Sequence, residues 1–270
     1  MEIELLERQS SELRKDIVEV CYHSKAGHVG GSLSAIDILN VLYFNELRID
    51  PNNPKMENRD RFILSKGHIA EALYVTLAKR GFFAYSELDN FSGYNTKYIG
   101  HPNNKVAGVE MNTGALGHGL AIGVGLAIAA KKMGQDYRTY VLMGDGELAE
   151  GSIWESAMAA GHYKLYNLCA IVDRNHLQIS GCTETVMTLE DLKGKWQMFG
   201  FEVIEIVGNN YEEIINAFTQ AKAIKNKPSL ILANTVKGKG VSFMENQASW
   251  HHGVLDAVQY KQALMELGDL

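Results

Sequence analysis

The stretch MGDGELAEGSIWES, residues 143–156, begins where the apolar run TYVLM ends. An apolar segment that ends in Gly-Asp-Gly is typical of a buried strand that turns into a helix, because glycines permit a sharp turn and the close approach of a ligand. Asp145 places a carboxylate at the tip of this turn. The helix expected to begin near residues 150–152 directs free N–H groups at the same point, and such groups attract phosphate. Since phosphate and aspartate repel each other, the turn predicts a divalent cation between them.

The pattern around this turn predicts an α/β fold. The first hundred residues read as mostly helical, whereas near-continuous apolar segments alternate with helical segments after residue 114. The expected strands cover residues 61–65, 140–144, 168–173, 201–207 and 229–236. The expected helices cover residues 2–23, 33–45, 69–80, 120–130, 152–165, 189–199 and 211–224. This alternation is typical of a mostly parallel sheet with helices on both faces.

Unusual residues follow four of the expected strands. They lie in the segments SKGH (65–68), GDGE (144–147), Arg174-Asn175 and KGKG (237–240). Ligands of parallel sheets bind at the carboxyl ends of the strands. These four segments are therefore expected to surround one site.

Asn175 follows Asp145 by thirty positions, about the length of one strand-helix-strand unit. The two side chains are therefore expected on adjacent strands. A carboxylate and an amide oxygen suit Mg²⁺, for which Ca²⁺ is a close substitute, and the backbone carbonyl of Leu177 could add a third oxygen. Read alone, GDG could equally be a surface turn. The position of Asn175 and the strands on both sides favour a site for a metal and a diphosphate.

The GDG turn followed by this asparagine resembles the diphosphate-binding motif of thiamine-diphosphate enzymes. GDGELAEGSIWE is similar to the transketolase version of that motif. Six further segments resemble transketolase signatures in the family's order along the whole chain: AGHVGGSLS (26–34), SKGH (65–68), GHP (100–102), TGALGHG (113–119), VKGKG (236–240) and WHHG (250–253). The resemblance implies the thiamine-diphosphate-binding fold, with thiamine diphosphate and Mg²⁺ or Ca²⁺ as cofactors.

The resemblance also implies roles for individual residues. Those expected to contact the cofactor are Lys66, His68, Gly114, Leu116, Gly144, Asp145, Gly146, Glu147, Asn175, Lys237 and His251, with Asp145, Asn175 and Leu177 as metal ligands. His28 and His101 would face the donor sugar, because imidazoles donate or accept hydrogen bonds near neutral pH. His252 is the alternative to His251. His118 departs from the family, where many members have Gln, and the turn GHVGGS lacks a Pro and an earlier Ser that some members carry.

Glu150 and Glu155 stand at the start of the helix after the metal turn. Acidic residues favour a helix N-terminus by themselves. In transketolases the matching glutamates form a proton relay between two active sites, so we expect a catalytic role for both, together with His28, His101 and His251.

The resemblance covers residues 1–270 as one diphosphate-binding domain. Transketolases carry the pyrimidine-binding domain, and the glutamate that activates the cofactor, in a following region that nothing here resembles. The chain is therefore expected to be the N-terminal subunit of a split transketolase, completed by a C-terminal subunit in an α₂β₂ heterotetramer. The implied reaction transfers a two-carbon ketol unit from a ketose phosphate to an aldose phosphate, as in the pentose phosphate pathway.

Composition excludes other classes of function. The net charge is −6, which argues against nucleic-acid binding. The longest apolar run, residues 120–130, is too short to span a bilayer. The charged N-terminus has no secretory signal, and the three cysteines have no metal-type spacing, so a cytoplasmic location is expected.

Several alternatives remain open at this point. The α subunit of a 2-oxo acid dehydrogenase also has the GDG…N motif, although the set of histidines argues against it. Deoxyxylulose-phosphate synthase is another relative, normally a single long chain. A non-catalytic regulatory subunit would keep the fold without the chemistry. A dinucleotide-binding oxidoreductase is poorly supported, because no G-x-G-x-x-G follows an expected strand.

Overall fold

The computed structural model describes residues 2–268. A five-stranded sheet forms its centre, in the order β1-β2-β3-β7-β6, and every neighbouring pair is parallel. The strands are β1 (Arg61–Leu64), β2 (Thr139–Gly144), β3 (Leu168–Arg174), β6 (Glu202–Val207) and β7 (Ser229–Asn234). All five were expected from their apolar runs, and the mostly parallel α/β sheet is confirmed.

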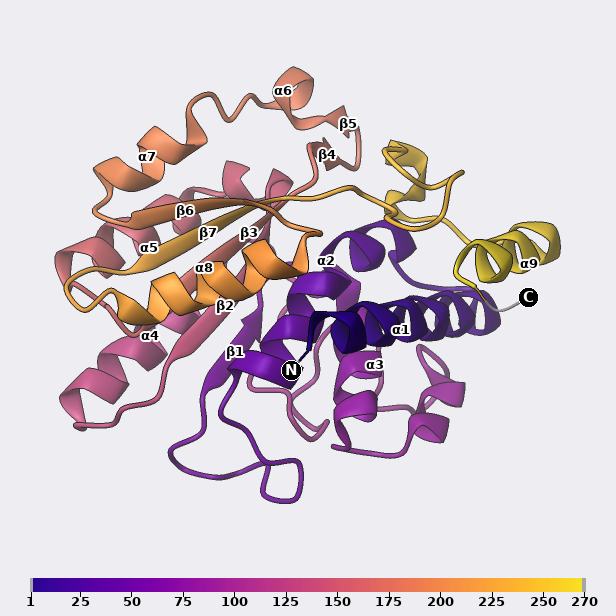
Figure 1. The fold of residues 1–270 in the computed structure, drawn as a ribbon, viewed down its shortest axis with the longest axis horizontal. Helices are drawn as coiled ribbons and strands as arrows, with labels where there is room; N and C mark the ends of the chain where they lie inside the picture. Colours follow the sequence, from indigo (N-terminus) through magenta and orange to yellow (C-terminus); the bar gives the residue numbers. More distant parts are fainter. Residues whose placement is uncertain (1, 269–270) are drawn as a thin grey trace.

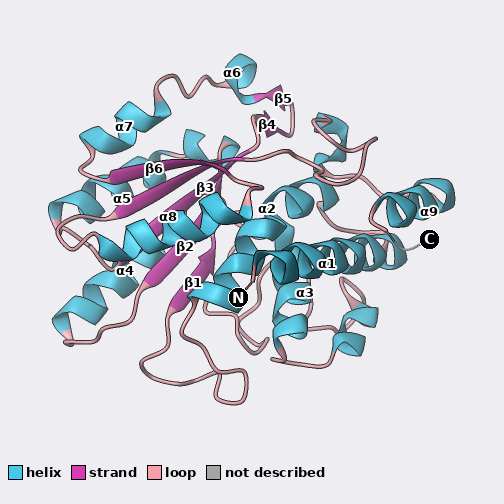
Figure 2. Cartoon of the chain, in the orientation of Figure 1, coloured by secondary structure: helices cyan, strands magenta, loops and turns pink. Residues whose placement is uncertain are grey.

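Helices cover both faces of this sheet (Figure 1). Alternate residues of each strand face opposite sides, as in any strand: Tyr140 and Leu142 of β2 join one hydrophobic core, whereas Val141 and Met143 join the other. The first core contains α1 (Ile3–Ser24), α2 (Val29–Val41), α3 (Ala70–Arg80) and α8 (Tyr211–Ala223). The second contains α4 (Gly119–Lys132), α5 (Gly151–His162) and α7 (Leu192–Met198). Figure 2 shows these two helical layers around the strands.

Helix α2 begins earlier than the expected residue 33, and this is a correction. It starts at Val29, includes Gly30 and Gly31, and continues into a π-helical turn, Leu42–Glu46. The segment GHVGGS was expected to be a turn, but its last residues lie inside the helix, where the glycines serve packing. A Cβ on Gly30 would lie 2.6 Å from the carbonyl oxygen of Trp250, and a Cβ on Gly31 would lie 3.1 Å from Ile69 Cγ2. Gly30 therefore lets the C-terminal segment pack directly on α2, and Gly31 does the same for Ile69.

Small elements around the sheet were not expected from the sequence. A hairpin of β4 (Leu177–Gln178) and β5 (Gly181–Cys182) follows β3, and α6 (Thr183–Val186) follows the hairpin. Short 3-10 helices cover Gly67–Ile69, Tyr85–Asn90, Gly146–Ala149 and Ala248–His251. The last helix, α9 (Ala257–Glu266), packs against α1. Within residues 2–268, none of the helices combines the length and the apolar character that crossing a membrane requires.

Candidate active site at the carboxyl ends of the strands

The four unusual segments meet at the carboxyl edge of the sheet, as expected. Because β1, β2, β3 and β7 are neighbours in that order, the segments that follow them surround one cavity of about 340 Å³. The predicted site residues that line this cavity are Lys66, His68, Leu116, Gly144, Asp145, Gly146, Glu147, Glu150, Asn175, Leu177, Lys237 and His251. Gly114, His28, His101 and Glu155 are not among the lining residues.

Asp145 is almost completely buried at the tip of β2. Its Oδ1 accepts a hydrogen bond from the Gly146 N–H at 2.8 Å, and its Oδ2 accepts one from the His176 N–H at 2.6 Å. The second bond places the carboxylate beside the segment that follows β3. Burial, and then repulsion by Asp173, raise the pKa of Asp145 to about 6. Although Arg174 Nη1 lies 3.6 Å from Asp145 Oδ2, the protein's own groups do not offset the cost of burying this carboxylate, and a cation beside it would favour its charged form.

Asn175 is oriented by its amide nitrogen. The Nδ2 donates to Ser34 Oγ and to Asp173 Oδ2, both at 3.3 Å, and Oδ1 accepts from the Leu177 N–H at 3.2 Å. The nitrogen is thus turned toward acceptors, while the oxygen lies on the side of the β4 hairpin. An aspartate oxygen, an amide oxygen and the Leu177 carbonyl are ligands that Mg²⁺ and Ca²⁺ accept. Within residues 2–268 no group of three or more His, Cys, Asp or Glu side chains forms a metal cluster, and the predicted ligand set needs only one carboxylate.

Asp173 is a site residue that the sequence analysis missed. It lies at the end of β3 with no exposed surface, and its Oδ2 accepts from Lys66 Nζ at 2.5 Å and from Ser34 Oγ at 2.6 Å. Its Oδ1 accepts from Thr235 Oγ1. Burial opposes ionisation, but the Lys66 ammonium and these donors hold the pKa of Asp173 below its usual value. The available signal was an acidic residue that ends the apolar run LCAIVD, two positions before Asn175.

Glu147 stabilises the site through hydrogen bonds made by its buried carboxylate. Its buried carboxylate accepts from Ser65 Oγ, from the Gly117 N–H at 2.8 Å and from the Gly144 N–H at 3.1 Å. These bonds join the ends of β1 and β2 to the TGALGHG segment. Both oxygens of Glu147 are therefore occupied within the protein, although the residue borders the cavity.

Imidazole rings gather beside the cavity. The ring of His28 lies 5.0 Å from that of His68, 5.4 Å from that of His251 and 4.8 Å from that of His252, measured between ring centroids. A Cβ on Gly114 would lie 2.6 Å from His101 Cδ2, so glycine is needed where this ring packs. Burial, and then the neighbouring His252 and His101, lower the pKa of His28 to about 4. Burial and Lys237 lower the pKa of His251 to about 3, so both rings are neutral at pH 7.

His28 is held by a second buried residue that the sequence analysis missed. Glu71 of α3 accepts a hydrogen bond from the His28 backbone N–H at 2.6 Å and another from Ser32 Oγ at 2.8 Å, both at Oε1. Its Oε2 has no hydrogen-bond partner among the described residues. Burial raises the pKa of Glu71. Since α3 directly follows the SKGH segment, the bond between Glu71 and the His28 N–H fixes the position of the His28 backbone relative to His68.

Lys237 and His251 close the cavity on the side of β7. Lys237 Nζ lies 3.1 Å from His251 Nδ1 and 3.5 Å from the Leu177 carbonyl oxygen, and the lysine is only 2 % exposed. Burial, and then repulsion by Lys66, lower the pKa of Lys237 to about 8. Of the two adjacent histidines, His251 lines the cavity, whereas His252 is exposed and touches the ring of His28 from outside.

The remaining predicted residues lie at the surface of this chain. Glu150 borders the cavity immediately before α5, and Glu155 lies one turn further on an exposed face of that helix. His118 is exposed, and its Nδ1 lies 3.0 Å from the carbonyl oxygen of Leu116.

Comparison with known proteins gives one answer. The sequence profile of the family described as "Transketolase, thiamine diphosphate binding domain" matches residues 7–269. The chain is 52 % identical over 269 residues to one subunit of the apulose-4-phosphate transketolase of Phocaeicola vulgatus, covering 100 % of this chain and 96 % of that protein. It is 43 % identical to the 6-deoxy-6-sulfo-D-fructose transketolase subunit SqwG of Clostridium sp., covering 97 % and 96 %. Human transketolase is 36 % identical, and there the match covers 98 % of this chain but 42 % of the relative.

Solved structures agree. A transketolase from Campylobacter jejuni superimposes with a TM-score of 0.94 at 37 % identity, over 99 % of this chain and 43 % of that one. A transketolase from Leishmania mexicana also reaches 0.94, at 31 % identity. The sheet order, the cavity at the strand ends and these matches lead to the same conclusion: the chain belongs to the transketolase family, in which it corresponds to the thiamine-diphosphate-binding domain.

Proposed function

We propose that this chain is the N-terminal subunit of a split transketolase that is active only with a C-terminal subunit. Support comes from relatives that are themselves named as single subunits of transketolases, which match this chain over 96 % of their own lengths. In the proposed α₂β₂ assembly, the partner supplies the pyrimidine-binding domain, and the cofactor lies between the two kinds of subunit.

The proposal depends most on one observation, that Asp145 and Asn175 approach one cavity from neighbouring strands. Asp145, the Asn175 Oδ1 and the Leu177 carbonyl would hold Mg²⁺ or Ca²⁺ against the diphosphate. Lys66, Lys237 and His68 border the same space and would offer donors to its oxygens. Thiamine diphosphate, when bound, supplies the chemistry that breaks and forms the carbon–carbon bond.

The imidazoles of His28, His101 and His251 would orient the donor sugar and exchange protons with its hydroxyl groups. Glu150 and Glu155 are exposed in the single chain and would meet a second copy across a twofold interface, where they would relay protons between two sites. Glu147, Gly114, Leu116, Gly144 and Gly146 would shape the backbone around the cofactor.

The proposed reaction transfers a two-carbon ketol unit from a ketose phosphate to an aldose phosphate. Relatives named for apulose-4-phosphate and for 6-deoxy-6-sulfo-D-fructose make unusual donors part of this proposal, beside the sugars of the pentose phosphate pathway.

The test combines the chain with its C-terminal subunit, thiamine diphosphate and Mg²⁺. The purified pair is assayed with apulose 4-phosphate, a sulfonated ketose and xylulose 5-phosphate as donors, each with aldose phosphate acceptors. Ketol transfer by the pair, lost when either subunit or Mg²⁺ is omitted, is the expected result. Failure of the pair to bind thiamine diphosphate in a Mg²⁺-dependent manner, together with inactivity, would instead indicate a non-catalytic subunit.

A further inference from the structure

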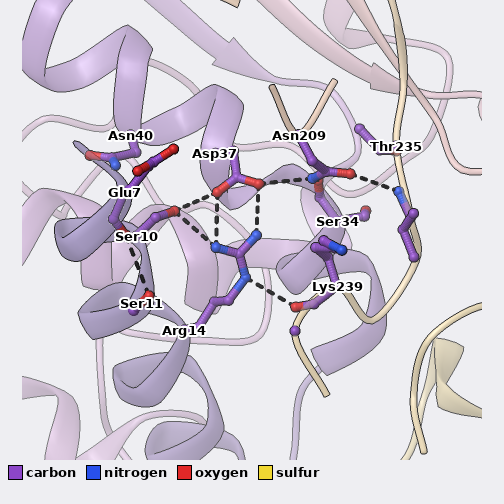
Figure 3. A network of polar contacts seen from close by, with 12 residues as sticks. Glu7, Ser10, Ser11, Arg14, Ser34, Asp37, Asn40, Asn209, Thr235 and Lys239 are labelled. Atoms are coloured by element: carbon purple, nitrogen blue, oxygen red, sulfur yellow. Dashed lines mark hydrogen bonds and ion pairs between the residues drawn. The ribbon is translucent and has the colours of Figure 1, made fainter. Parts of the chain in front are cut away.

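A buried polar network lies next to the cavity without lining it. Asp37 of α2 accepts from Ser10 Oγ at 2.5 Å, from Tyr211 Oη at 2.6 Å and from Asn209 Nδ2 at 2.8 Å. Arg14 of α1 donates to both oxygens of Asp37, from Nη1 at 2.9 Å and from Nη2 at 2.7 Å. Figure 3 shows Asp37 between Arg14 and Asn209, in contact with both. None of these five residues borders the cavity, so the network has no direct contact with a ligand there.

The network reaches the segment that carries Lys237 at two points. The Arg14 Nε donates to the Lys239 carbonyl oxygen at 3.0 Å, and the Asn209 Oδ1 accepts from the Val236 N–H at 3.0 Å (Figure 3). These contacts lie one residue before Lys237 and two residues after it. We call Arg14, Asp37 and Asn209 the loop clamp.

The segment needs such support because it lies outside regular structure. β7 ends at Asn234, and residues 236–247 contain no helix or strand. Turn-type backbone bonds such as the one from the Val241 N–H to the Gly238 carbonyl shape the segment locally, whereas the bond from the Gly238 N–H to the Gly30 carbonyl, at 2.9 Å, ties it to α2. The Asn246 N–H donates to the Lys237 carbonyl at 2.9 Å and closes the loop on itself. Gly238 has φ +75°, a conformation that favours glycine. The position of the Lys237 side chain therefore depends on contacts made by distant residues.

The charges of Arg14 and Asp37 and the planar shape of the Arg14 guanidinium allow the loop clamp to hold the loop in one position. Although burial opposes both charges, pairing with Asp37 raises the pKa of Arg14, and the same pairing lowers the pKa of Asp37. A planar guanidinium can bind both carboxylate oxygens and still direct its Nε elsewhere, which a lysine ammonium cannot do. A buried ion pair by itself is weak evidence for stability, whereas its fixed geometry sets the relative positions of the elements it joins.

We propose that Arg14, Asp37 and Asn209 are positioning residues, which hold residues 236–240 on α1 and α2 and so place the Lys237 ammonium over the cavity. The consequence for the cofactor rests on the proposed function. The placement of the loop itself does not.

The first experiment compares two neighbouring asparagines. Asn209→Ala removes the contacts to Asp37 and Val236. Asn210→Ala is the matched control, because the Asn210 side chain caps α8 through the Glu213 N–H at 3.1 Å and, among the described residues, makes no side-chain hydrogen bond to the clamp or to the loop. Amide hydrogen exchange is measured by mass spectrometry on the full chain, without ligand.

Asn209→Ala is expected to raise exchange at least tenfold in peptides covering residues 237–246, including the Gly238 and Asn246 amides, and to leave β3 unchanged. Asn210→Ala is expected to raise exchange only at the start of α8. Unchanged exchange of residues 237–246 in Asn209→Ala, or an equal increase in both variants, would overturn the proposal.

The second experiment measures thiamine diphosphate affinity by titration calorimetry, with Mg²⁺ and the partner subunit. Asn209→Ala and Arg14→Lys are each expected to weaken binding about tenfold, and Asn210→Ala less than twofold. If the clamp acts through Lys237, adding Asn209→Ala to Lys237→Met weakens binding no further. Fully additive losses would show that the clamp does not act through Lys237. If the wild-type pair binds no cofactor, the proposed function fails, whereas hydrogen exchange still decides the role of the clamp.

Discussion

Lys66 and Asp173 form a buried ion pair beneath the cavity: Lys66 Nζ lies 2.5 Å from Asp173 Oδ2, and the two side chains are 2 % and 0 % exposed. The lysine expected to face a diphosphate is thus already bound to a carboxylate of the same chain. A bound diphosphate would share the Lys66 ammonium with Asp173, so Lys66 has a structural role in addition to its proposed role in binding.

Lys66→Met is expected to lower the free energy of unfolding by about 3–5 kcal/mol, because it leaves the Asp173 carboxylate buried and unpaired. Urea denaturation of the chain without ligand measures this loss. The double variant Lys66→Met/Asp173→Asn is expected to recover much of it, since the buried charge is gone. Equal stability of Lys66→Met and the wild type would show that Asp173 does not depend on this lysine.

Asp145→Asn separates metal binding from stability. The substitution removes a carboxylate whose ionisation is disfavoured by burial, since its pKa is raised to about 6. The amide keeps one acceptor oxygen for the N–H groups of Gly146 and His176, so loss of the buried charge is offset in part, and the chain without metal is expected to lose no more than about 1–3 kcal/mol of stability at pH 7. Mg²⁺-dependent binding of thiamine diphosphate by the complete pair is expected to be lost, as measured by calorimetry. Retained binding would show that Asp145 is not a metal ligand.

His28 makes the folding stability of the chain depend on pH in the acid range. Its pKa is lowered from 6.5 to about 4, first by burial and then by His252 and His101, with Lys237 adding a smaller effect. Below pH 6.5 the unfolded chain takes up a proton that the folded chain resists, so this group removes stability as the pH falls from 6.5 toward 4. Above pH 6.5 it contributes no change.

The comparison of wild type with His28→Gln at pH 7.5 and pH 5 isolates this effect. The variant is expected to lose less stability between the two values. An imidazole resonance of His28 that titrates near pH 6.5 in NMR spectra would contradict the expected shift.

Substitutions of Glu71 test how the backbone turn at His28 is held in place. Glu71→Gln keeps an acceptor for the His28 N–H, and burial already disfavours the charge, so little change in melting temperature is expected. Glu71→Leu leaves that buried N–H without its acceptor and is expected to cost about 1–3 kcal/mol. Thermal unfolding of both variants provides the measurement. A large loss in Glu71→Gln would indicate that the ionised carboxylate is essential.

Two glycines of α4 are expected to respond oppositely to alanine. A Cβ on Gly123 would lie 2.4 Å from Val141 Cγ2, and valine has little rotamer freedom to move away. Gly123→Ala is therefore expected to destabilise the chain by about 1–3 kcal/mol. A Cβ on Gly125 meets nothing within 4 Å, so Gly125→Ala is expected to stabilise by roughly 0.5–1 kcal/mol through helix propensity. Chemical denaturation of the isolated chain measures both, and equal effects would contradict the packing of α4 on β2.

The sequence predicted the parts of this protein that depend on local pattern. Apolar runs located all five strands of the sheet, and the order of strands and helices predicted its parallel arrangement. The GDG turn and Asn175 were expected on neighbouring strands because the chain length between them matches one strand-helix-strand unit. The motifs also predicted the family, and the carboxyl-edge rule predicted that four separate segments would share one cavity.

Other features depended on packing between distant residues. The start of α2 was misplaced because GHVGGS was expected to be a turn, whereas Gly30 and Gly31 lie inside the helix and allow the close approach of Trp250 and Ile69. The roles of Asp173 and Glu71 appear only when their partners are in place, and Arg14 meets Lys239 across 225 positions of sequence. Hydrophobic periodicity reports which face of an element is buried, but it carries no information about which polar groups are buried together. Those pairings arise from tertiary packing, because a buried charge or N–H group takes as its partner whatever group the fold brings within hydrogen-bonding distance.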